Sequence, residues 1–600
     1  MDTDTPFGNR FQHARRVCYA LVLPLLLALS DPVVHAQLAF GLGGTGSDQG
    51  SAIAVDAAGN MYLSGLFFGT ADFDPGPGVF ELTAGGTATF VASYDILGAL
   101  RYAFAIGGAS VVVPERGIAV DDAGNVYVTG SFTGLVDFDP GPDENLLNFG
   151  DGRIFVASYD PNGTLLYAFN VGGGLSNLIE GGAAIALDAA EDNLYITGTF
   201  NDEDDFDPDG DGPIIESDGN TDAFVASYGA TSGAFRFAFR LGGSGTDQGF
   251  GIATDAANNC YVTGWFRETA DFDPGIEEHL LTSEGGEDLF LASYTGDGDF
   301  RYALGVGSLG SASADRGRAV AVDAAGNAFM TGHFGGDIGE MADFDPGLGE
   351  EILTSNGNED AFLASYDPNG DLRFAFGFGG PDPTRGYGTT LDADGNVYLT
   401  GLFAGAIDFD PGPGEQIVGT IGDHAFGASY THTGAYRLAY HFPSIGVDGG
   451  ETGYGIAVDA AAQPHITGAF GQTVDFDPGS GVAELTASGP SDIFVTNFAA
   501  TTVAAEPLAP LAESFTLSTA YPNPSTGLAR LNLVVRKTQP VHAEVVDVLG
   551  RRVALLYDSV LPAGTQHTLT VEGEDLPSGL YFVRVQGATF ATQQPVLVTK

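Results

Sequence analysis

The feature that most constrains this chain is a tetrapeptide, Asp-Phe-Asp-Pro, which recurs seven times at spacings of 65 to 72 residues. The copies begin at Asp72, Asp137, Asp205, Asp271, Asp343, Asp408 and Asp475. A period of this length indicates a supersecondary unit that stacks on its neighbours, rather than about four unrelated domains of roughly 150 residues each. The repeat therefore constrains the fold before any single residue is considered.

Each repeat contains four short apolar runs separated by turn residues. In the first copy the runs cover residues 53–56, 61–67, 90–94 and 102–106. Gly59 and Asn60 lie between the first two runs and suit a hairpin turn in which both central residues have positive φ. The 89 Gly, 43 Phe and 22 Tyr favour β structure and exclude an all-α fold. Four strands repeated seven times predict an all-β fold, a seven-bladed β-propeller.

The two ends of the repeat region predict how the ring closes. Residues 38–42 match the fourth strand of the unit but precede the first copy, whereas the seventh copy stops at residue 498 without a fourth strand. We expect the N-terminal strand to complete blade seven, because an open array would leave unpaired sheet edges at both ends.

The repeat resembles a known family. Gly43-Gly-Thr-Gly-Ser-Asp-Gln-Gly50, followed by Ile53-Ala-Val-Asp-Ala-Ala-Gly-Asn60, Tyr62-Leu-Ser-Gly65 and Ala71-Asp-Phe73, is similar to the bacterial seven-bladed β-propeller (SBBP-type) repeat. The resemblance covers residues 38–498. It implies the propeller fold but no fixed activity, because a fold of this kind hosts many functions.

The first 36 residues are typical of a secretory signal peptide. Arg10, Arg15 and Arg16 precede an apolar run over residues 17–29, and a small residue, Ala36, marks the expected cleavage site. The apolar run is shorter than the about 20 residues that cross a bilayer, so we expect no transmembrane segment in the mature chain. The predicted propeller then spans residues 37–498.

The C-terminal part differs in composition. Residues 499–513 are rich in Ala, Thr and Pro and are typical of a linker, and residues 514–600 contain alternating apolar runs that predict a small β-sandwich. Tyr521-Pro-Asn-Pro524, with the segments 546–551, 576–583 and 596–600, resembles the C-terminal sorting domain of type IX secretion. This resemblance implies the type IX secretion machinery as a partner and export across the outer membrane of a Bacteroidetes-like bacterium, to the cell surface or the medium.

The charge of the chain limits its partners. It has 22 Lys and Arg against 78 Asp and Glu, a net charge of −56. Residues 37–513 hold 12 Arg, no Lys and 69 acidic residues, so almost all of the excess belongs to the repeats. Nucleic acid is excluded as a partner, because its binding needs a basic surface.

The repeated aspartates suggest a cation. Carboxylates at positions i and i+2 of a loop are hard oxygen ligands of the kind that Ca²⁺ prefers, which makes Ca²⁺ the one cofactor that the sequence suggests. The best copy contains Asp205, Asp207, Asp209 and Asp211. Alternatively, the aspartates cap their own turns by accepting backbone N–H bonds, with the Phe packed between blades.

Departures from the repeat suggest a binding site. Trp265 and His333 stand where most other copies have a small or aliphatic residue, and Arg267 follows shortly after Trp265. Arg316 and Arg385 are expected in the loops entering blades five and six, on the same face. An aromatic ring beside arginine binds sugars or anions. Alternatively, the arginines neutralise the acidic rim and Trp265 fills a gap between blades.

No catalytic template is present. The chain has no H-E-x-x-H, G-x-S-x-G or P-loop motif, although 69 acidic residues supply many carboxylate pairs of the kind used in glycoside cleavage. The sequence favours a secreted or cell-surface, non-enzymatic module that binds an unidentified extracellular ligand, a glycan or a protein. An extracellular polysaccharide hydrolase or lyase is the alternative, and a structural surface protein is a third.

Overall fold

The computed structural model describes residues 38–107, 112–172, 181–210, 212–308, 314–347, 349–412, 416–444, 450–477, 482–497, 515–517, 527–535, 537–547, 551–563, 566–573, 576–587 and 591–600. The chain divides into two compact units, Met1–Thr501 and Thr502–Lys600. All the regular structure of both units, within the described residues, is β apart from a few isolated turns.

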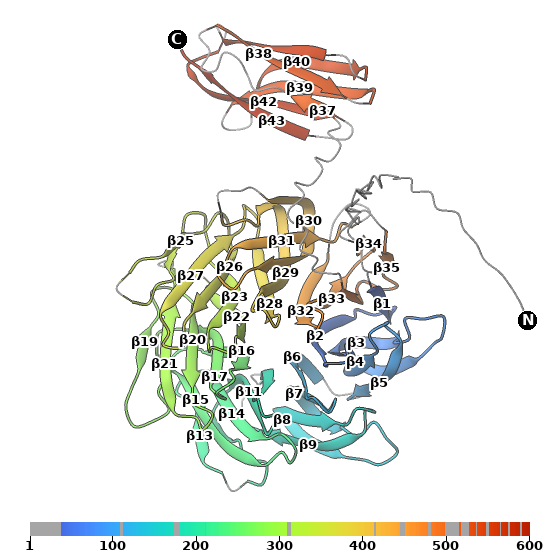
Figure 1. The fold of residues 1–600 in the computed structure, drawn as a ribbon, viewed down its shortest axis with the longest axis vertical. Helices are drawn as coiled ribbons and strands as arrows, with labels where there is room; N and C mark the ends of the chain where they lie inside the picture. The colour runs from blue at the N-terminus through green and yellow to red at the C-terminus, as the bar shows by residue number, and fades with distance from the viewer. Residues whose placement is uncertain are drawn as a thin grey trace, which may run out of the picture. The chain divides into compact units, whose positions relative to one another are not determined.

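The first unit is built from four-stranded antiparallel sheets, the arrangement typical of propeller blades (Figure 1). The first three sheets are β2 (Gln49–Val55), β3 (Met61–Asp72), β4 (Glu81–Tyr94) and β5 (Leu100–Ile106); β6 (Val112–Val120), β7 (Val126–Asp137), β8 (Leu146–Tyr159) and β9 (Leu165–Val171); and β10 (Gly181–Leu187), β11 (Asn193–Phe200), β14 (Asp222–Gly229) and β15 (Phe235–Gly243).

The next three sheets repeat this order. They are β16 (Gln248–Thr254), β17 (Cys260–Phe266), β20 (Asp288–Tyr294) and β21 (Phe300–Val306); β22 (Arg316–Val322), β23 (Ala328–Phe334), β26 (Asp360–Tyr366) and β27 (Leu372–Phe378); and β28 (Thr384–Leu391), β29 (Val397–Asp408), β30 (Ile417–Tyr430) and β31 (Tyr436–His441).

The last sheet of the first unit combines both ends of the repeat region. β32 (Thr452–Val458), β33 (Pro464–Phe470) and β36 (Asp492–Asn497) pair in that order, and β1 (Leu38–Gly44) pairs antiparallel with β36. Leu38 lies opposite Asn497, and Leu42 lies opposite Ile493. The N-terminal strand therefore takes the fourth place beside three strands that come from residues more than 400 positions away. Its end also pairs with β3, where Gly43 lies opposite Asp72, so that the first and last groups of four strands join into one eight-stranded sheet.

The first strand of each sheet is the innermost one. β2, β6, β10, β16, β22, β28 and β32 each contact the corresponding strand of the next sheet, and β32 contacts β2 (Figure 1). The approach is close, since a Cβ added to Gly455 of β32 would stand 3.0 Å from the Cα of Ala52 in β2.

The hydrophobic core of the first unit lies between sheets. One buried cluster joins Val91 and Ile106 of the first sheet to Val128 and Phe155 of the second. Another joins Phe40 and Leu42 of β1, through Ile493 and Val495, to the first sheet. Strands such as β17 and β26 are buried along their whole length, because neighbouring sheets cover both of their faces.

The turn between the first two strands of a sheet is held by an aspartate. Asp56 Oδ1 accepts N–H bonds from Ala58 and Asn60 at 2.9 and 2.8 Å, and the Gly59 N–H bonds to the Asp56 carbonyl oxygen at 2.9 Å. Gly59 has φ +83°, whereas Asn60 is not among the positive-φ residues. The prediction of two positive-φ residues is therefore wrong, because the aspartate closes a longer turn that needs only one.

The Asp-Phe-Asp-Pro loop is fixed by internal contacts. Phe73 is fully buried, its ring meets Phe67 edge-on at 5.6 Å, and its carbonyl oxygen accepts the Tyr94 hydroxyl at 2.9 Å. In four repeats the loop carries a short two-stranded ribbon: β12 (Glu203–Asp205) with β13 (Ile214–Glu216), β18 (Thr269–Asp271) with β19 (Leu280–Thr282), β24 (Met341–Asp343) with β25 (Ile352–Thr354), and β34 (Thr473–Asp475) with β35 (Glu484–Thr486).

The second unit consists of two sheets with a shared core. The sheets are β37 (Phe515–Leu517), β38 (Leu528–Val535) and β41 (Gln566–Glu572), and β40 (Arg552–Leu561), β39 (Gln539–Asp547), β42 (Gly579–Gly587) and β43 (Ala591–Val598). Leu531 and Leu569 of the first sheet pack with Val545 and Val583 of the second. The alternation of buried and exposed residues along β38 is that of a sandwich strand.

Candidate functional site

Four of the five predicted binding residues come together where the fourth and fifth sheets meet. Trp265 lies near the end of β17, Arg267 follows that strand, and Arg316 begins β22. The guanidinium carbons of Arg267 and Arg316 lie 5.5 and 5.4 Å from the centre of the Trp265 ring. Both arginines bond to Glu287, Arg267 through Nη2 at 2.7 Å and Arg316 through Nε. His333 pairs with Arg316 across β22 and β23.

The fifth residue, Arg385, lies one sheet further along. It is the second residue of β28, and its Nε bonds to Glu359. Arg316 and Arg385 thus belong to strands, so their expected position in loops is wrong. The sequence analysis also missed Glu287 and Glu359. Each directly precedes the first residue of a third strand, and each faces an arginine at the start of the next sheet, a correspondence that only a comparison of successive repeats reveals.

The residues of this cluster differ in exposure: the aromatic side chains are buried and the arginine side chains are partly exposed. Trp265 and His333 are 5% and 1% exposed, so Trp265 offers no open face on which a sugar ring could stack. The Trp265 Nε1 has no hydrogen-bond partner among the described residues. The side chains of Arg267, Arg316 and Arg385 are 49%, 29% and 34% exposed. A ligand at this rim would therefore meet guanidinium groups, with Trp265 beneath them.

The predicted calcium loop shows turn-capping contacts. Asp205 Oδ1 accepts the Asp207 N–H at 2.9 Å, and Asp207 Oδ1 accepts the Asp209 N–H at 3.0 Å. The same i to i+2 bond occurs in the other repeats, for example from the Asp74 N–H to Asp72 Oδ1 at 3.0 Å. Asp211 lies outside the described residues, and among those described no group of three or more His, Cys, Asp or Glu is arranged to hold a metal ion. Calcium binding stays a prediction.

Buried carboxyl groups meet where sheets adjoin. Asp222 begins β14, Asp247 precedes β16, and both are almost fully buried. A Cβ at Gly242 would lie 2.4 Å from Asp222 Oδ1 and 2.6 Å from Asp247 Oδ2, so only glycine leaves room for both groups. Asp247 accepts N–H bonds from Gly243 and Arg267, and Arg240 Nε lies 3.7 Å from Asp222. Burial, followed by the charge of Asp222, raises the pKa of Asp247 to about 8.

Equivalent positions at other seams hold related pairs. Burial raises the pKa of Asp315 to about 7 and that of Asp288 to about 6 at the seam between the fourth and fifth sheets. At the seam between the sixth and seventh sheets, His424 Nδ1 lies 2.8 Å from Glu451 Oε2 instead. The seam position therefore tolerates different chemistry, provided that the buried charge is neutralised by a proton or a partner.

The innermost strands share a β-bulge. Their pairing with the second strand of each sheet shifts by one residue at the same place in β2, β10, β16, β22, β28 and β32. The extra residues are Ser51, Ala183, Phe250, Arg318, Tyr387 and Tyr454. A bulge re-aims the side chain of its extra residue, and five of these six residues line a cavity between the innermost strands.

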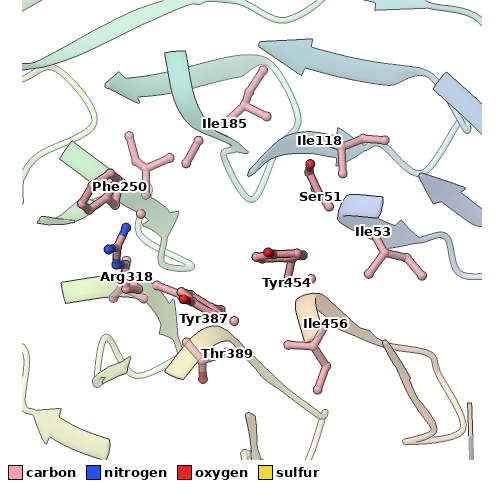
Figure 2. Close-up of a pocket in the computed structure, with 18 residues that line it drawn as sticks. Ser51, Ile53, Ile118, Ile185, Phe250, Arg318, Tyr387, Thr389, Tyr454 and Ile456 are labelled. Atoms are coloured by element: carbon pink, nitrogen blue, oxygen red, sulfur yellow. The ribbon is translucent and has the colours of Figure 1, made fainter. Parts of the chain in front are cut away.

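This cavity has a volume of about 130 Å³ and is lined by residues from every innermost strand of the first unit (Figure 2). The guanidinium carbon of Arg318 lies 4.5 Å from the centre of the Phe250 ring, and the rings of Tyr387 and Tyr454 are 5.5 Å apart and tilted by 38°. Figure 2 shows Arg318, Tyr387 and Tyr454 projecting into the space between the strands. The sequence analysis missed all of these residues.

Comparisons with known proteins agree with both parts of the chain. Residues 106–131 match the family described as a β-propeller repeat, and residues 519–599 match the secretion system C-terminal sorting domain. An uncharacterized WD repeat-containing protein of Acanthamoeba polyphaga mimivirus is 23% identical over 262 residues, which cover 40% of this chain and 19% of that relative. The match therefore spans a small part of the relative's own length.

Helices that cross membranes are long and apolar, and none of the described residues forms one. The C-terminal match fixes the destination, because a sorting domain of this type directs its cargo through type IX secretion. The chain is therefore a secreted β-propeller protein with an SBBP-type repeat and a type IX C-terminal sorting domain, delivered across the outer membrane to the cell surface or the medium.

Proposed function

We propose that the repeats form a seven-bladed ring closed by β1. The contact between β32 and β2 supports closure, and so does the pairing of β1 with β36. The seam that β1 joins also has the same backbone bond as an internal seam. The Asp48 N–H donates to the Ser491 carbonyl oxygen at 2.9 Å, just as the Asp247 N–H donates to the Thr221 carbonyl oxygen at 2.8 Å.

We further propose that this ring is a non-enzymatic binding module for an extracellular ligand, a glycan or a protein. One observation carries the proposal. Three partly exposed guanidinium groups lie on neighbouring sheets: those of Arg267 and Arg316 bond to Glu287, and that of Arg385 bonds to Glu359. Arginines gathered in this way are unusual in a repeat region with 12 Arg, no Lys and 69 acidic residues. Such a patch attracts anionic groups while the surrounding surface repels them.

A glycan array probed with the mature full-length protein tests this function. We expect acidic glycans to bind and Arg385→Gln to weaken the signal. Arg584→Gln in the second unit is the matched control, because it removes the same charge from a side chain that is 48% exposed. Equal signals from wild type and Arg385→Gln, or no bound glycan and no bound protein partner, would overturn the proposal.

The hydrolase or lyase alternative lacks a specific observation. Among the described residues that line the cavity, none is an Asp or a Glu, so this cavity supplies no carboxylate pair for glycoside cleavage. Calcium at Asp205, Asp207 and Asp209 is retained as a separate proposal, which is tested below.

A further inference from the structure

The identity of the extra residue in the β-bulge varies from repeat to repeat, although the backbone around it is the same. In all six innermost strands that share the one-residue bulge, glycine precedes the extra residue and Ala or Gly follows it. The extra residue itself changes from Ser51 through Phe250 and Arg318 to Tyr387 and Tyr454. A position that keeps its geometry and changes its chemistry is suited to recognition, because the fold does not depend on the side chain placed there.

We propose that the cavity between the innermost strands, here called the channel cavity, binds a single sugar ring that carries a carboxylate, such as a uronate residue of an acidic glycan. The inference deepens the proposed function and rests on it, since it names the ligand chemistry of a binding module. It places the carboxylate-bearing ring in the cavity between the innermost strands and leaves the rim of Arg267, Arg316 and Arg385 as the proposed contact for the rest of the glycan.

The carboxylate is matched by Arg318. This is the one charged residue among the described residues that line the cavity. The planar guanidinium binds carboxylates through two parallel N–H bonds, and its position over the Phe250 ring fixes its orientation. An arginine held in place in this way loses little conformational entropy when a ligand binds.

The sugar ring is matched by the rest of the wall. Ser51, Tyr387, Thr389 and Tyr454 bring hydroxyl groups to the cavity, and the two tyrosine rings add apolar faces (Figure 2). Aliphatic residues such as Ile53, Ile185 and Ile456 complete the lining. Aromatic and aliphatic side chains with polar groups placed among them are typical of small-molecule sites. The volume of about 130 Å³ suits a small occupant such as one sugar ring.

Isothermal titration calorimetry of the mature full-length protein with D-galacturonate and D-galactose tests the inference. The two sugars differ by a carboxylate in place of a hydroxymethyl group. We expect galacturonate to bind at least about tenfold more tightly, the range expected for one charge-assisted interaction. Equal affinity for the two sugars, or no binding of galacturonate, would overturn the assignment.

Two variants locate the bound sugar. Arg318→Gln should remove the preference for galacturonate. Ser51→Tyr should fill the cavity while leaving Arg318 intact, and tyrosine is the residue found at the same position in two other repeats, so the backbone accommodates it. Both should weaken galacturonate binding at least about tenfold. Wild-type affinity in Ser51→Tyr, with an unchanged melting temperature, would contradict a channel site even if Arg318→Gln failed to fold.

Arg385→Gln and Arg584→Gln separate this inference from the function on which it rests. Arg584→Gln removes a charge in the second unit, outside both proposed contacts, and should leave galacturonate binding unchanged. If Arg385→Gln weakens the glycan-array signal and Arg318→Gln leaves galacturonate affinity unchanged, the ligand is bound at the rim alone, so the channel inference fails and the binding function stands. If no galacturonate is bound and the glycan array is also blank, both fail.

Discussion

The Asp-Phe-Asp-Pro loops and the channel wall both recur from repeat to repeat, but the loops conserve side chains whereas the wall conserves backbone geometry. Each loop keeps its side chains: Phe73 is buried, the first aspartate accepts the N–H of the second, and Tyr94 bonds to the Phe73 carbonyl oxygen. The channel wall keeps its backbone, a bulge between small residues, while the bulged side chain differs from sheet to sheet. Unchanged side chains therefore stabilise the fold, whereas we propose that the side chains that vary on an unchanged backbone bind the ligand.

Deleting Leu38–Gly44 should have the largest effect. The comparison assumes that all seven contacts between neighbouring sheets are built alike, and this deletion removes one of them. The deletion removes the fourth strand of one sheet together with buried Phe40 and Leu42, whose burial contributes roughly 1.5–3 kcal/mol each. We expect a large fall in melting temperature, measured by calorimetry. Leu38→Ala, at a half-buried position, is the control and should have a small effect. An unchanged melting temperature after the deletion would mean that the ring does not depend on β1.

The loop side of the comparison predicts a strong contrast between two neighbours. Phe272 of the fourth repeat is 1% exposed, and Ile276 in the same loop is fully exposed. Phe272→Ala should lower the free energy of unfolding by about 3–5 kcal/mol through the cavity that it leaves. Ile276→Ala should change it by less than about 0.5 kcal/mol. Similar effects of the two substitutions in denaturant unfolding would show that the repeated Phe is not structural.

The seam carboxyls predict a dependence of stability on pH. Folding raises the pKa of Asp247 to about 8 from an ordinary value of 3.8. The folded state therefore binds more protons than the unfolded chain between these values, and the stabilising effect is complete below pH 4 and lost as the pH rises to 8. Asp315, with a pKa raised to about 7, acts in the same direction. We expect the melting temperature to be higher at pH 5 than at pH 8.5.

Asp247→Asn isolates this contribution. Asparagine stays neutral at every pH, so the variant should show a smaller difference in melting temperature between pH 5 and pH 8.5 than the wild type. Asp273→Asn in an exposed loop, where Asp273 accepts the Gly275 N–H at 2.8 Å, is the control and should keep the wild-type difference. If Asp247→Asn has the wild-type pH profile, Asp247 does not hold a proton in the folded state.

The calcium proposal predicts a smaller effect. Millimolar CaCl₂ should raise the melting temperature in a saturable way, beyond NaCl of equal ionic strength, because a bound ion stabilises by RT ln(1 + [L]/Kd). Asp207→Ala should remove part of the gain. A response to both salts through ionic strength alone would mean that screening of the acidic surface, and not a discrete site, is responsible.

The strand order was predictable because it is encoded locally. Glycine and aspartate mark the turns, and buried runs between them mark the strands. The prediction of two positive-φ residues at Gly59 and Asn60 was wrong because Asp56 closes the turn from outside the two-residue window. Local patterns therefore predict that a turn exists more reliably than they predict its geometry.

The site was predicted only in part because much of it depends on register. Trp265, Arg267 and Arg316 stand out as departures from the repeat, and the structure brings them together. Glu287, which joins both arginines, was hidden among many acidic residues. Tyr454 was missed because a bulge is a property of two paired strands, so no single strand predicts which residue it re-aims.

The most direct test of the central claim is to measure stability and galacturonate affinity together in Tyr454→Ser. Serine is the residue at the same position in the first repeat, so the backbone should be unaffected. The account predicts a free energy of unfolding within about 1 kcal/mol of the wild type and an at least about tenfold rise in the Kd for galacturonate. A large loss of stability with unchanged affinity would contradict it, because the varied side chain would then serve the fold and not recognition.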